Sequence, residues 1–562
     1  MHLVEHIHYR NHHSENYSRA LRSIGVFLII LGEVISLQCL DGAYSSGFGG
    51  HPDEAAHFVS ALMVRDFLGH IGAVAPVEFA QSFYLHYPKV AIGNWPPLMY
   101  ALSGIWFLVF GATRASALAF IALVVAATAT AIYAIGRKLL SPFAGLFAAA
   151  LYVALPLVQE SSAMFMTEHL VTLLILLSAI QFARFAETQK TLDALLFGML
   201  ASAAILTRGS AWALLLVPPF VIALTRNWRL LLNWRLWLVA LPVVFLCVPW
   251  YIYAKGMSRG AMTGIDPTAP MAFFTSAMLA FPTFVGRAAG PILCALAALG
   301  IWQTIRARQY ASHWSALLAL IIGILLIQSI VPASIEQRFM VQLLPSLLLF
   351  AGAGAHWLIR KLLPTTNTRP LPATAAWLAT AALIMLTIFN LPNRIRNSGY
   401  AEVASALRDG ARGINSPVIF LSSDPVGEGS VVAAIAAANA ASDPVCLRGS
   451  KILVEEDWLG RGSRDRFPTE EELHTLLDAI PVDAVMVDEA IVEQWQRPYH
   501  ERLGKLLRRD TRNWRLGAAF RVVRHGQSYP AAVRVYLRRR PYDKQLPSTT
   551  NMALIGKLMQ RN

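Results

Sequence analysis

Long apolar runs recur along the first two thirds of the chain, separated by short polar stretches. A helix of about 20 apolar residues matches the hydrocarbon thickness of a bilayer, about 30 Å. Residues 115–136 and 139–159 carry no charged side chain and fit this length. The pattern predicts membrane-embedded helices near residues 23–40, 96–111, 115–135, 139–158, 162–183, 193–207, 210–225, 235–254, 287–303, 314–331, 339–358 and 372–391.

The polar stretches carry their charge unevenly, and this predicts an orientation, because Lys and Arg concentrate in the cytoplasmic loops of multispanning proteins. Basic clusters stand at Arg137-Lys138, Arg184 to Lys190, Arg226/Arg229/Arg235, Arg306/Arg308 and Arg360-Lys361. We therefore expect residues 1–22 to form a cytoplasmic tail, with 41–95 as an outer loop. Segment 96–111 breaks the alternation: either it re-enters without crossing, or another segment is miscounted. About eleven to thirteen spans fit the pattern.

Composition supports this assignment. The chain has 562 residues, of which 55% are hydrophobic and 15% are charged, and its mean hydropathy is +0.47. A soluble protein needs more surface charge than this. The net charge of +14 follows from basic inner loops, and a basic C-terminal region can also contact anionic lipid. We therefore expect a lipid bilayer as a partner and no nucleic acid.

From residue 392 onward the apolar runs shorten and the charge density rises. Short β-rich runs predict strands at 417–422, 483–488, 520–523 and 533–537, and helical patterns cover 431–441 and 470–479. Residues 392–562 are therefore expected to form an extracytoplasmic α/β domain, about 170 residues long and within the usual domain range. It follows a transmembrane module at residues 23–391.

The outer loop 41–95 contains a predicted helix with an acidic start. Pro52 suits the first helical position and Gly69 suits the end, with apolar residues at helical spacing between them. We expect this amphipathic helix to lie in the membrane interface. Asp53 and Glu54 fall in its first turn, and His57 lies one turn after Asp53. Acidic residues there can simply complement the helix dipole.

Other charged residues favour a catalytic role for Asp53 and Glu54 over a role in complementing the helix dipole. Glu168, Arg208 and Arg338 adjoin apolar segments, where ionisable groups are costly and commonly functional. Lys89 lies in the outer loop. The predicted topology brings all of them to the face that carries Asp53. Carboxylates can deprotonate a hydroxyl group and cations can hold a phosphate, so the set suggests a reaction on a lipid-linked phosphate.

Several short motifs then suggest a family. The chain has His51-Pro52-Asp53-Glu54, Trp95-Pro96-Pro97-Leu98, Gly111 with Arg114, and Glu336-Gln337-Arg338-Phe339, in that order. It resembles the polytopic glycosyltransferases of the GT-C fold, in the subgroup of dolichyl-phosphate-mannose protein mannosyltransferases and the lipid A aminoarabinose transferase. The resemblance covers roughly residues 20–390, and the Asp-Glu pair is its most specific element.

The resemblance implies an inverting transfer of a sugar from a polyprenyl-phosphate donor to a hydroxyl acceptor on a lipid, glycan or protein. Asp53 would be the general base, and Glu54 would help to place the acceptor. The donor phosphate would be held by Lys89, Arg208 and Arg338. Further substrate contacts are expected from His57, Glu168 and Trp95, although Trp95 stands where the family often has His.

The resemblance implies no required cofactor. A divalent cation is the other option, held between Asp53 and Glu168 with Glu54 nearby. We expect a multi-pass protein of a bacterial-type inner membrane, and the sequence gives no oligomeric state.

Two other classes stay open at this level. One is a transporter of a lipid or amphiphile, favoured by the broken region 193–225 but not by any internal repeat. The other is a sensor or scaffold whose outer domain binds a ligand.

Overall fold

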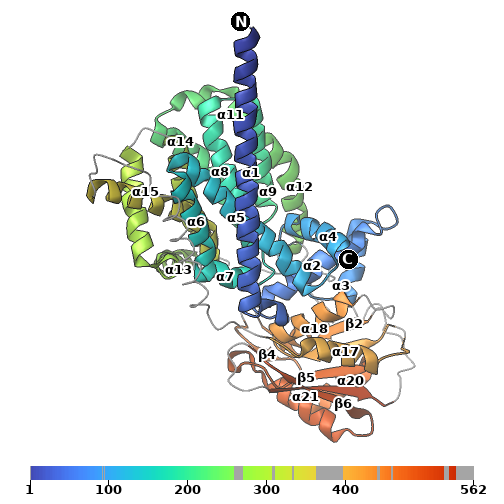
Figure 1. Cartoon of the computed structure of the whole chain (residues 1–562). Coiled ribbons are helices and arrows are strands. Elements are labelled where there is room, and N and C mark those ends of the chain that lie inside the picture. The colour runs from blue at the N-terminus through green and yellow to red at the C-terminus, as the bar shows by residue number, and fades with distance from the viewer. Residues whose placement is uncertain are drawn as a thin grey trace.

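The computed structural model describes residues 2–90, 93, 95–258, 270–306, 311–331, 334–362, 397–414, 416–438, 444–456, 460–524 and 531–539. These form a helical module and an α/β domain packed against one end of it, and the long first helix points away from that domain (Figure 1). This architecture confirms the predicted fold class, a polytopic α-helical protein with a C-terminal α/β domain.

The helices and 3-10 turns of the module follow one another with short connections. They are α1 (His2–Leu40), η1 (Ala43–Ser45), α2 (Pro52–Leu68), α3 (Pro76–His86), α4 (Leu98–Phe110), α5 (Arg114–Leu139), α6 (Pro142–Ala154), α7 (Pro156–Ser162), α8 (Glu168–Thr188), α9 (Thr191–Ile205), η2 (Gly209–Leu216), α10 (Val217–Thr225), η3 (Trp228–Leu232), α11 (Trp234–Trp237), α12 (Ala240–Ser258), α13 (Pro270–Arg306), α14 (Ala311–Ile330), η4 (Gln337–Leu343) and α15 (Leu344–Leu362).

Seven helical stretches among the described residues are long and apolar enough to cross a membrane. Helices α6 and α7 would make an eighth span if they are taken together, although they meet at a bend of 61°. The bend follows from sequence, because the residue before a proline avoids the helical region. Leu155 is extended and Pro156 starts α7. The predicted span at 372–391 lies outside the described residues.

Helix α4 accounts for the break in the predicted alternation. It has 13 residues, which gives a length of about 20 Å, well short of the roughly 30 Å of a bilayer core. The length favours re-entry over a full crossing for segment 96–111. The predicted segments 193–207 and 210–225 likewise form apolar helices too short to count as spans. Segment 287–303 belongs to the longer α13, which is kinked at Gly290.

The C-terminal domain is a mixed sheet with helices on both faces. Its sheet has the order β2-β1-β5-β7-β6, in which β1 pairs in parallel with β2 and β5, and β7 pairs antiparallel with β5 and β6. The strands are β1 (Val418–Ser422), β2 (Val445–Arg448), β5 (Ala484–Asp488), β6 (Trp514–Val522) and β7 (Ala531–Arg538), beside a small ribbon of β3 (Val454–Glu455) and β4 (Arg464–Asp465). The helices are α17 (Tyr400–Gly410), α18 (Pro425–Ala437), α19 (Gly449–Ile452), α20 (Glu470–Ala479) and α21 (Pro498–Arg509), with η5 at Glu493–Trp495.

Several elements of this domain differ from the sequence predictions. Strand β2, four residues long, was not predicted. Strand β6 starts at Trp514, earlier than the predicted 520, since its exposed residues lack a clear alternation. Helix α18 starts at Pro425 and not at 431, because Asp424 caps it by accepting hydrogen bonds from the Val426 and Gly427 backbone N–H groups.

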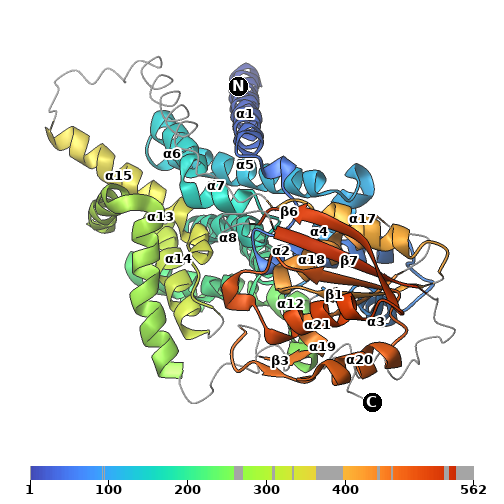
Figure 2. The same ribbon diagram turned by 90° about the horizontal axis from the view of Figure 1, so that it is seen from below.

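Alternate side chains of β1 belong to two different cores. Ile419 and Leu421 lie in the core that continues into the helical module, whereas Val418 and Phe420 lie in a second core with α20 and α21. Helices α17 and α18 lie on the module side of the sheet, and α21 lies on the far side (Figures 1 and 2). The α/β domain thus packs against the module through α18.

Helix α2 lies between α4 of the module and α18 of the α/β domain. Its residues from Glu54 to Leu62 are all buried. The sequence predicted an amphipathic helix with one polar face, but protein covers this helix on both of these sides. Asp53, at the start of α2, therefore sits where the module and the α/β domain meet.

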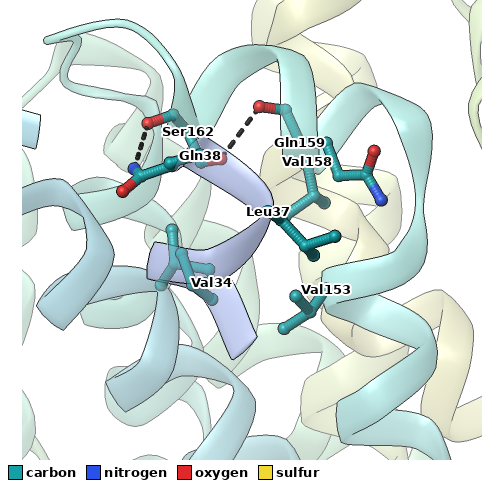
Figure 3. Close-up of a pocket in the computed structure, with 8 residues that line it drawn as sticks. Val34, Leu37, Gln38, Val153, Val158, Gln159 and Ser162 are labelled. Carbon is teal, nitrogen blue, oxygen red and sulfur yellow. Dashed lines mark hydrogen bonds between the residues drawn. The ribbon is translucent and has the colours of Figure 1, made fainter. Parts of the chain in front are cut away.

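A small cavity lies elsewhere in the module, between α1, α5, α6 and α7. It is lined by Leu37 and Val153, among others, and has a volume of about 10 Å³ (Figure 3). Gln38 closes one side by donating a hydrogen bond to the Ser162 carbonyl at 2.8 Å. Such a volume is close to that of one water molecule, so it offers no room for a substrate.

Candidate active site

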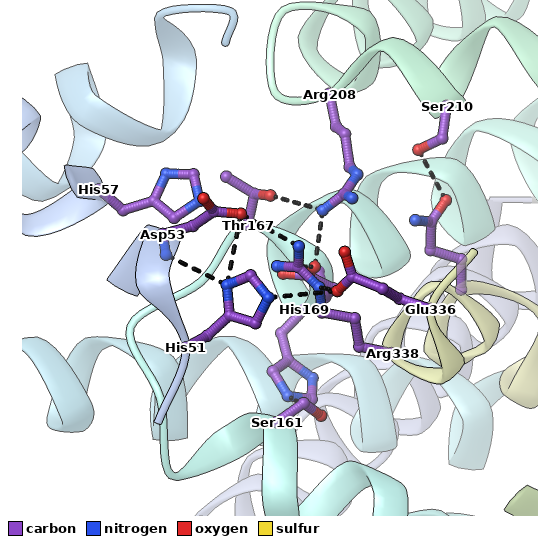
Figure 4. A network of polar contacts seen from close by, with 12 residues as sticks. His51, Asp53, His57, Ser161, Thr167, His169, Arg208, Ser210, Glu336 and Arg338 are labelled. Atoms are coloured by element: carbon purple, nitrogen blue, oxygen red, sulfur yellow. Dashed lines mark hydrogen bonds and ion pairs between the residues drawn. The ribbon is translucent and has the colours of Figure 1, made fainter. Parts of the chain in front are cut away.

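A network of acidic and basic side chains joins four segments that are far apart in sequence (Figure 4). Arg338 lies 3.1 Å from a carboxylate oxygen of Asp53 and 3.1 Å from one of Glu168. Arg208 reaches the same Glu168 oxygen at 2.7 Å. The structure therefore brings together four of the site residues predicted from sequence.

Each member of this network stands where a helical element begins. Asp53 is in the first turn of α2, and Glu168 is the first residue of α8. Arg208 is the extended residue before η2, and Arg338 is the second residue of η4. The first N–H groups of a helix are unpaired and carry partial positive charge. The helix starts therefore favour the two carboxylates and would also favour an incoming anion.

The side chain of Phe339 lies beside both arginines. The guanidinium carbon of Arg208 is 4.6 Å from the centre of its ring, and that of Arg338 is 5.2 Å away. Arginine stacks on an aromatic face through its planar guanidinium group. Phe339 thus holds two like charges close together. No role was predicted for it, although it stands in the Glu336-to-Phe339 motif.

Arg208 has the more open guanidinium group of the two. It contacts one carboxylate and the Thr167 hydroxyl, at 3.1 Å, both through Nη1. Arg338 contacts three carboxylates, those of Asp53, Glu168 and Glu336. Arg208 therefore keeps more of its N–H donors for another acceptor.

The environment of Asp53 keeps its carboxylate ionised. Burial by itself would raise the pKa of Asp53, but His51 and Arg338 outweigh burial and lower it. The Asp53 side chain is 29% exposed, so an acceptor molecule can reach it. Glu168, in contrast, is fully buried, and one of its oxygens has no hydrogen-bond partner among the described residues.

His51 and Glu336 join the network at its exposed side. Nδ1 of His51 accepts a hydrogen bond from the Asp53 backbone N–H at 3.1 Å and so caps α2. Its Nε2 lies 3.3 Å from Glu336. The pKa of Glu336 is lowered, because hydrogen bonds from His51 and the charge of Arg338 outweigh the effect of burial. No site role was predicted for His51 or Glu336, although both stand in the motifs that carried the family resemblance.

His57 and Trp95, two predicted substrate contacts, lie together in an aromatic group. Their ring centres are 4.5 Å apart, and His57 Nδ1 is 2.8 Å from the Tyr100 hydroxyl. Burial lowers the pKa of His57 to about 4, so its ring is neutral near pH 7. His57 is 1% exposed. The predicted substrate contacts of His57 and Trp95 stay predictions.

Glu54 has a set of partners different from that of Asp53. Its carboxylate accepts hydrogen bonds from the backbone N–H groups of Gly49, at 3.0 Å, and Gly50, at 3.1 Å. It also accepts from the Phe165 backbone N–H at 3.3 Å and pairs with Arg114 at 3.4 Å. Glu54 thereby joins the loop before α2 to the loop before α8. Its predicted part in acceptor binding stays a prediction, while these contacts give it a structural one.

Lys89 lies against the α/β domain and not in the ion-pair network. Its ammonium group donates a hydrogen bond to the Pro425 carbonyl at 3.0 Å. Burial and nearby Arg448 lower the pKa of Lys89 to about 7, despite the opposing effect of Asp53. Near neutral pH its charge is therefore easily changed, and its predicted role as a phosphate ligand stays a prediction.

Further contacts fix the α/β domain to the outer loop. Ser430 donates a hydrogen bond to the Phe48 carbonyl at 2.7 Å, and Arg448 donates one to the Pro88 carbonyl at 3.2 Å. Arg448 is itself held by Glu428 at 2.9 Å. The domain therefore supports the loop that carries Asp53, a relationship with no signal in the sequence.

Arginine side chains pair with the carboxylates of this network. Among the described residues, no group of three or more His, Cys, Asp and Glu side chains has the arrangement of a metal site. Asp53 and Glu168, the predicted cation ligands, are instead joined by the guanidinium group of Arg338.

The fold and this network define a multispanning membrane protein with a carboxylate and guanidinium site at one end of its helical module. Residues 94–253 match the family model described as dolichyl-phosphate-mannose-protein mannosyltransferase. No curated protein sequence matches the chain.

Solved structures extend the likeness to nearly the whole chain. ArnT from Cupriavidus metallidurans bound to undecaprenyl phosphate shares 13% identity at a TM-score of 0.55, covering 92% of this chain and 98% of ArnT. Its apo state shares 14% identity at a TM-score of 0.55, covering 93% and 98%. The Archaeoglobus fulgidus oligosaccharyltransferase in complex with zinc and sulfate shares 12% identity at a TM-score of 0.53, covering 82% of this chain and 67% of that one. The chain therefore has the GT-C fold of polytopic glycosyltransferases, as its motifs predicted.

Proposed function

We propose that this protein is a glycosyltransferase that moves a sugar from a polyprenyl-phosphate donor to a hydroxyl group of a lipid, glycan or protein, with inversion at the sugar. The observation that carries the proposal is the partly exposed carboxylate of Asp53 held 3.1 Å from Arg338. A base and a cation at this distance can act on the two ends of one transfer reaction.

In this mechanism Asp53 takes the proton of the acceptor hydroxyl while the hydroxyl oxygen attacks the anomeric carbon of the sugar. The bond from that carbon to the phosphate oxygen breaks, and its electron pair stays with the polyprenyl phosphate. Arg338 and Arg208 stabilise the charge that develops on this leaving group. Arginine suits the task because its fork can donate two hydrogen bonds to one phosphate.

Arg208 is the better placed of the two for the phosphate, since it has fewer carboxylate partners. Arg338 would hold Asp53 in position and add charge. Lys89 would contribute only if its hydrogen bond to Pro425 gave way to the donor. Asp53 attacks no carbon in this scheme, so the sugar changes configuration once.

The comparisons support the same reading. ArnT, which shares the fold, has been solved with undecaprenyl phosphate bound, and the matching family model is named for a dolichyl-phosphate sugar reaction. From the basic clusters in the predicted inner loops, we place the site at the outer face of a bacterial-type inner membrane, with a cytoplasmic N-terminus.

The test compares Asp53→Asn with Asp66→Asn. Asp66 lies on the same helix and pairs with its neighbour Arg65 at 2.6 Å, so this variant controls for loss of a carboxylate in α2. Membranes that contain each variant receive a lipid extract of polyprenyl-phosphate sugars from cells grown on radioactive glucose. The proposal expects loss of sugar transfer for Asp53→Asn alone. Full transfer by Asp53→Asn would refute Asp53 as the base. If the wild-type protein transferred no sugar but moved the lipid across the membrane, the transporter would be favoured.

A further inference from the structure

A second cavity lies at the end of the module that is away from the candidate active site. It opens between the end of α10, η3 and the first turn of α14, and its volume is about 610 Å³. Figure 1 shows α11, which follows η3, at the end of the module away from the α/β domain. A volume of this size is in the range of small-molecule sites. The residues that line the cavity are Thr225, Arg226, Asn227, Trp228, Arg229 and Ser312.

Two arginines of this cavity carry positive charge without an acidic partner. Among the described residues, the guanidinium groups of Arg226 and Arg229 make no ion pair and no hydrogen bond, and both side chains are exposed. Arg235, in the same basic cluster, instead donates a hydrogen bond to the Gln189 carbonyl at 3.1 Å. Arginine stays protonated in proteins. An anion in the cavity would therefore meet two positive charges whose N–H donors are available.

The backbone at Arg226 is in a conformation that suits glycine better than arginine. Its φ is 55°, in the left-handed region, at the residue that ends α10. Glycine is the usual residue there, because it has no Cβ atom to clash. The backbone therefore gives no reason for an arginine at this position, and a glycine can replace it without disturbing the turn.

The same segment exposes large apolar side chains, which locates it at a membrane surface. Trp228 is 58% exposed and Leu232 is 89% exposed, and Trp234 and Trp237 of α11 are exposed as well. Tryptophan is enriched where a bilayer meets water, because its ring is apolar and its N–H can reach polar groups. Arginines beside these rings lie at the depth of the lipid phosphates.

We propose that this cavity binds the phosphate headgroup of one anionic phospholipid, with Arg226 and Arg229 on the phosphate oxygens. The fork of each arginine can donate two hydrogen bonds to one phosphate. Ser312 and Asn227 supply hydrogen-bonding groups for the rest of the headgroup, and Trp228 packs against the start of the acyl chains. The basic loops predict that this end is cytoplasmic, where the leaflet is rich in anionic lipid. The site does not depend on the sugar-transfer reaction.

A lipid in this cavity would hold two parts of the module together. Arg226 and Arg229 follow α10, whereas Ser312 belongs to α14. Next to Ser312, His313 lies 2.9 Å from Lys138 at the end of α5 and 2.9 Å from Glu187 at the end of α8. A ligand that binds only the folded protein raises its melting temperature. The lipid should therefore stabilise this end of the module, and the effect should require both arginines.

The test uses the full chain in a nonionic detergent, as wild type and with Arg226→Gly and Arg229→Gln combined. Glycine fits the φ of residue 226, and Arg229 has no ion pair to lose among the described residues, so the fold should persist. Arg360→Gln is the matched control, because Arg360 is exposed at another predicted cytoplasmic loop but does not line the cavity. Each protein is titrated with phosphatidylglycerol, phosphatidylcholine or inorganic phosphate. Native mass spectrometry measures binding, and thermal unfolding measures stability.

We expect the wild type to hold one phosphatidylglycerol molecule tightly and to melt at a higher temperature with it. Loss of a charge-assisted hydrogen bond weakens binding by about 10-fold or more. The double variant should therefore bind this lipid about 100-fold more weakly, and Arg229→Gln alone about 10-fold more weakly. Arg360→Gln should bind it as the wild type does, and phosphatidylcholine should bind more weakly than phosphatidylglycerol.

Wild-type affinity in the double variant would overturn the proposal. So would an equal loss in Arg360→Gln, which would mean diffuse attraction by any basic loop, or equal binding of phosphatidylcholine. If inorganic phosphate raised the melting temperature as much as the lipid does, the cavity would take a soluble anion and the lipid would be wrong. Circular dichroism checks that the double variant is folded, and Arg229→Gln by itself provides the same test if it is not.

Discussion

Arg338 and Asp53 are separated by 285 positions in the sequence, yet their side chains lie 3.1 Å apart. Arg338 belongs to η4 and Asp53 to α2, and Glu168 at the start of α8 contacts the same guanidinium group. Any change at Arg338 therefore alters the proposed base, a buried carboxylate and a proposed phosphate-binding cation together.

Replacing Arg338 with Gln should reduce both transfer and stability. The change leaves the buried Glu168 with Arg208 alone, so it should cost less than the roughly 3 to 5 kcal/mol of a buried charge that is left without any partner. Arg338→Lys keeps the positive charge but not the planar guanidinium group with its paired N–H donors. This variant should therefore be more stable than Arg338→Gln while still losing sugar transfer. Thermal unfolding in detergent and the sugar-transfer assay measure the two effects. The exposed Arg287, changed to Gln, is the control and should alter neither.

Substitution of Asp53 should reduce sugar transfer, whereas substitution of Glu54 should reduce the stability of the fold. Asp53→Asn removes the base but few structural contacts, so the protein should remain stable and lose transfer. Glu54→Ala removes the acceptor for the N–H groups of Gly49, Gly50 and Phe165, and it also removes the ion pair with Arg114. It should lower the melting temperature clearly. If Glu54→Ala unfolds as the wild type does and yet fails to transfer, Glu54 acts on the substrate and not on the fold.

His57 should make the protein less stable as the pH falls from about 6.5 to 4. Burial lowers its pKa to about 4 in the folded state, against about 6.5 in the unfolded chain. In this window the unfolded chain takes up a proton that the folded protein does not, which favours unfolding by up to roughly 3 kcal/mol.

The variant His57→Gln should weaken this pH dependence, and melting curves at pH 7 and pH 4.5 measure it. His500 in the α/β domain has its pKa lowered to about 3 by burial, so part of the dependence should remain. Equal pH dependence in wild type and variant would show that His57 is not the cause. Asp53 should also make the protein less stable as the pH falls, but at lower pH than His57 does. Its pKa is lowered in the folded protein, so its carboxylate loses its charge only below the ordinary range.

Gly429→Val should loosen the α/β domain from the outer loop. A Cβ atom at Gly429 would lie 2.8 Å from the Lys89 side chain and 3.1 Å from that of Ala55. We expect faster protease cleavage between the domains and slower transfer. Gly286 has no neighbour within 4 Å of such an atom, so Gly286→Val is the matched control. Unchanged cleavage of Gly429→Val would mean that the loop does not depend on this contact.

Chelation should leave sugar transfer unchanged, because guanidinium groups balance the carboxylates of Asp53 and Glu168. The assay is run before and after EDTA treatment, with zinc or magnesium added back. A loss of transfer that added metal restores would instead support the divalent cation between these two carboxylates.

The sequence by itself determined the class of protein. Apolar runs long enough to cross a bilayer can be recognised without knowing their neighbours, because length and hydropathy decide insertion. The composition change at residue 392 located the α/β domain. Short motifs pointed to Asp53 and Arg338, and a position between apolar segments pointed to Arg208. Local signals also placed the start of α2, through Pro52 and the acidic residues after it.

Tertiary structure alone decided which charged groups meet. Asp53 and Glu54 are adjacent in sequence, but successive helical residues point about 100° apart, so one enters the ion-pair network and the other ties two loops together. Lys89 has the sequence context of a phosphate ligand, but packing of α18 gives it the Pro425 carbonyl. Such partners come from segments hundreds of residues away, and a local pattern holds no information about which of them will lie close in the folded chain.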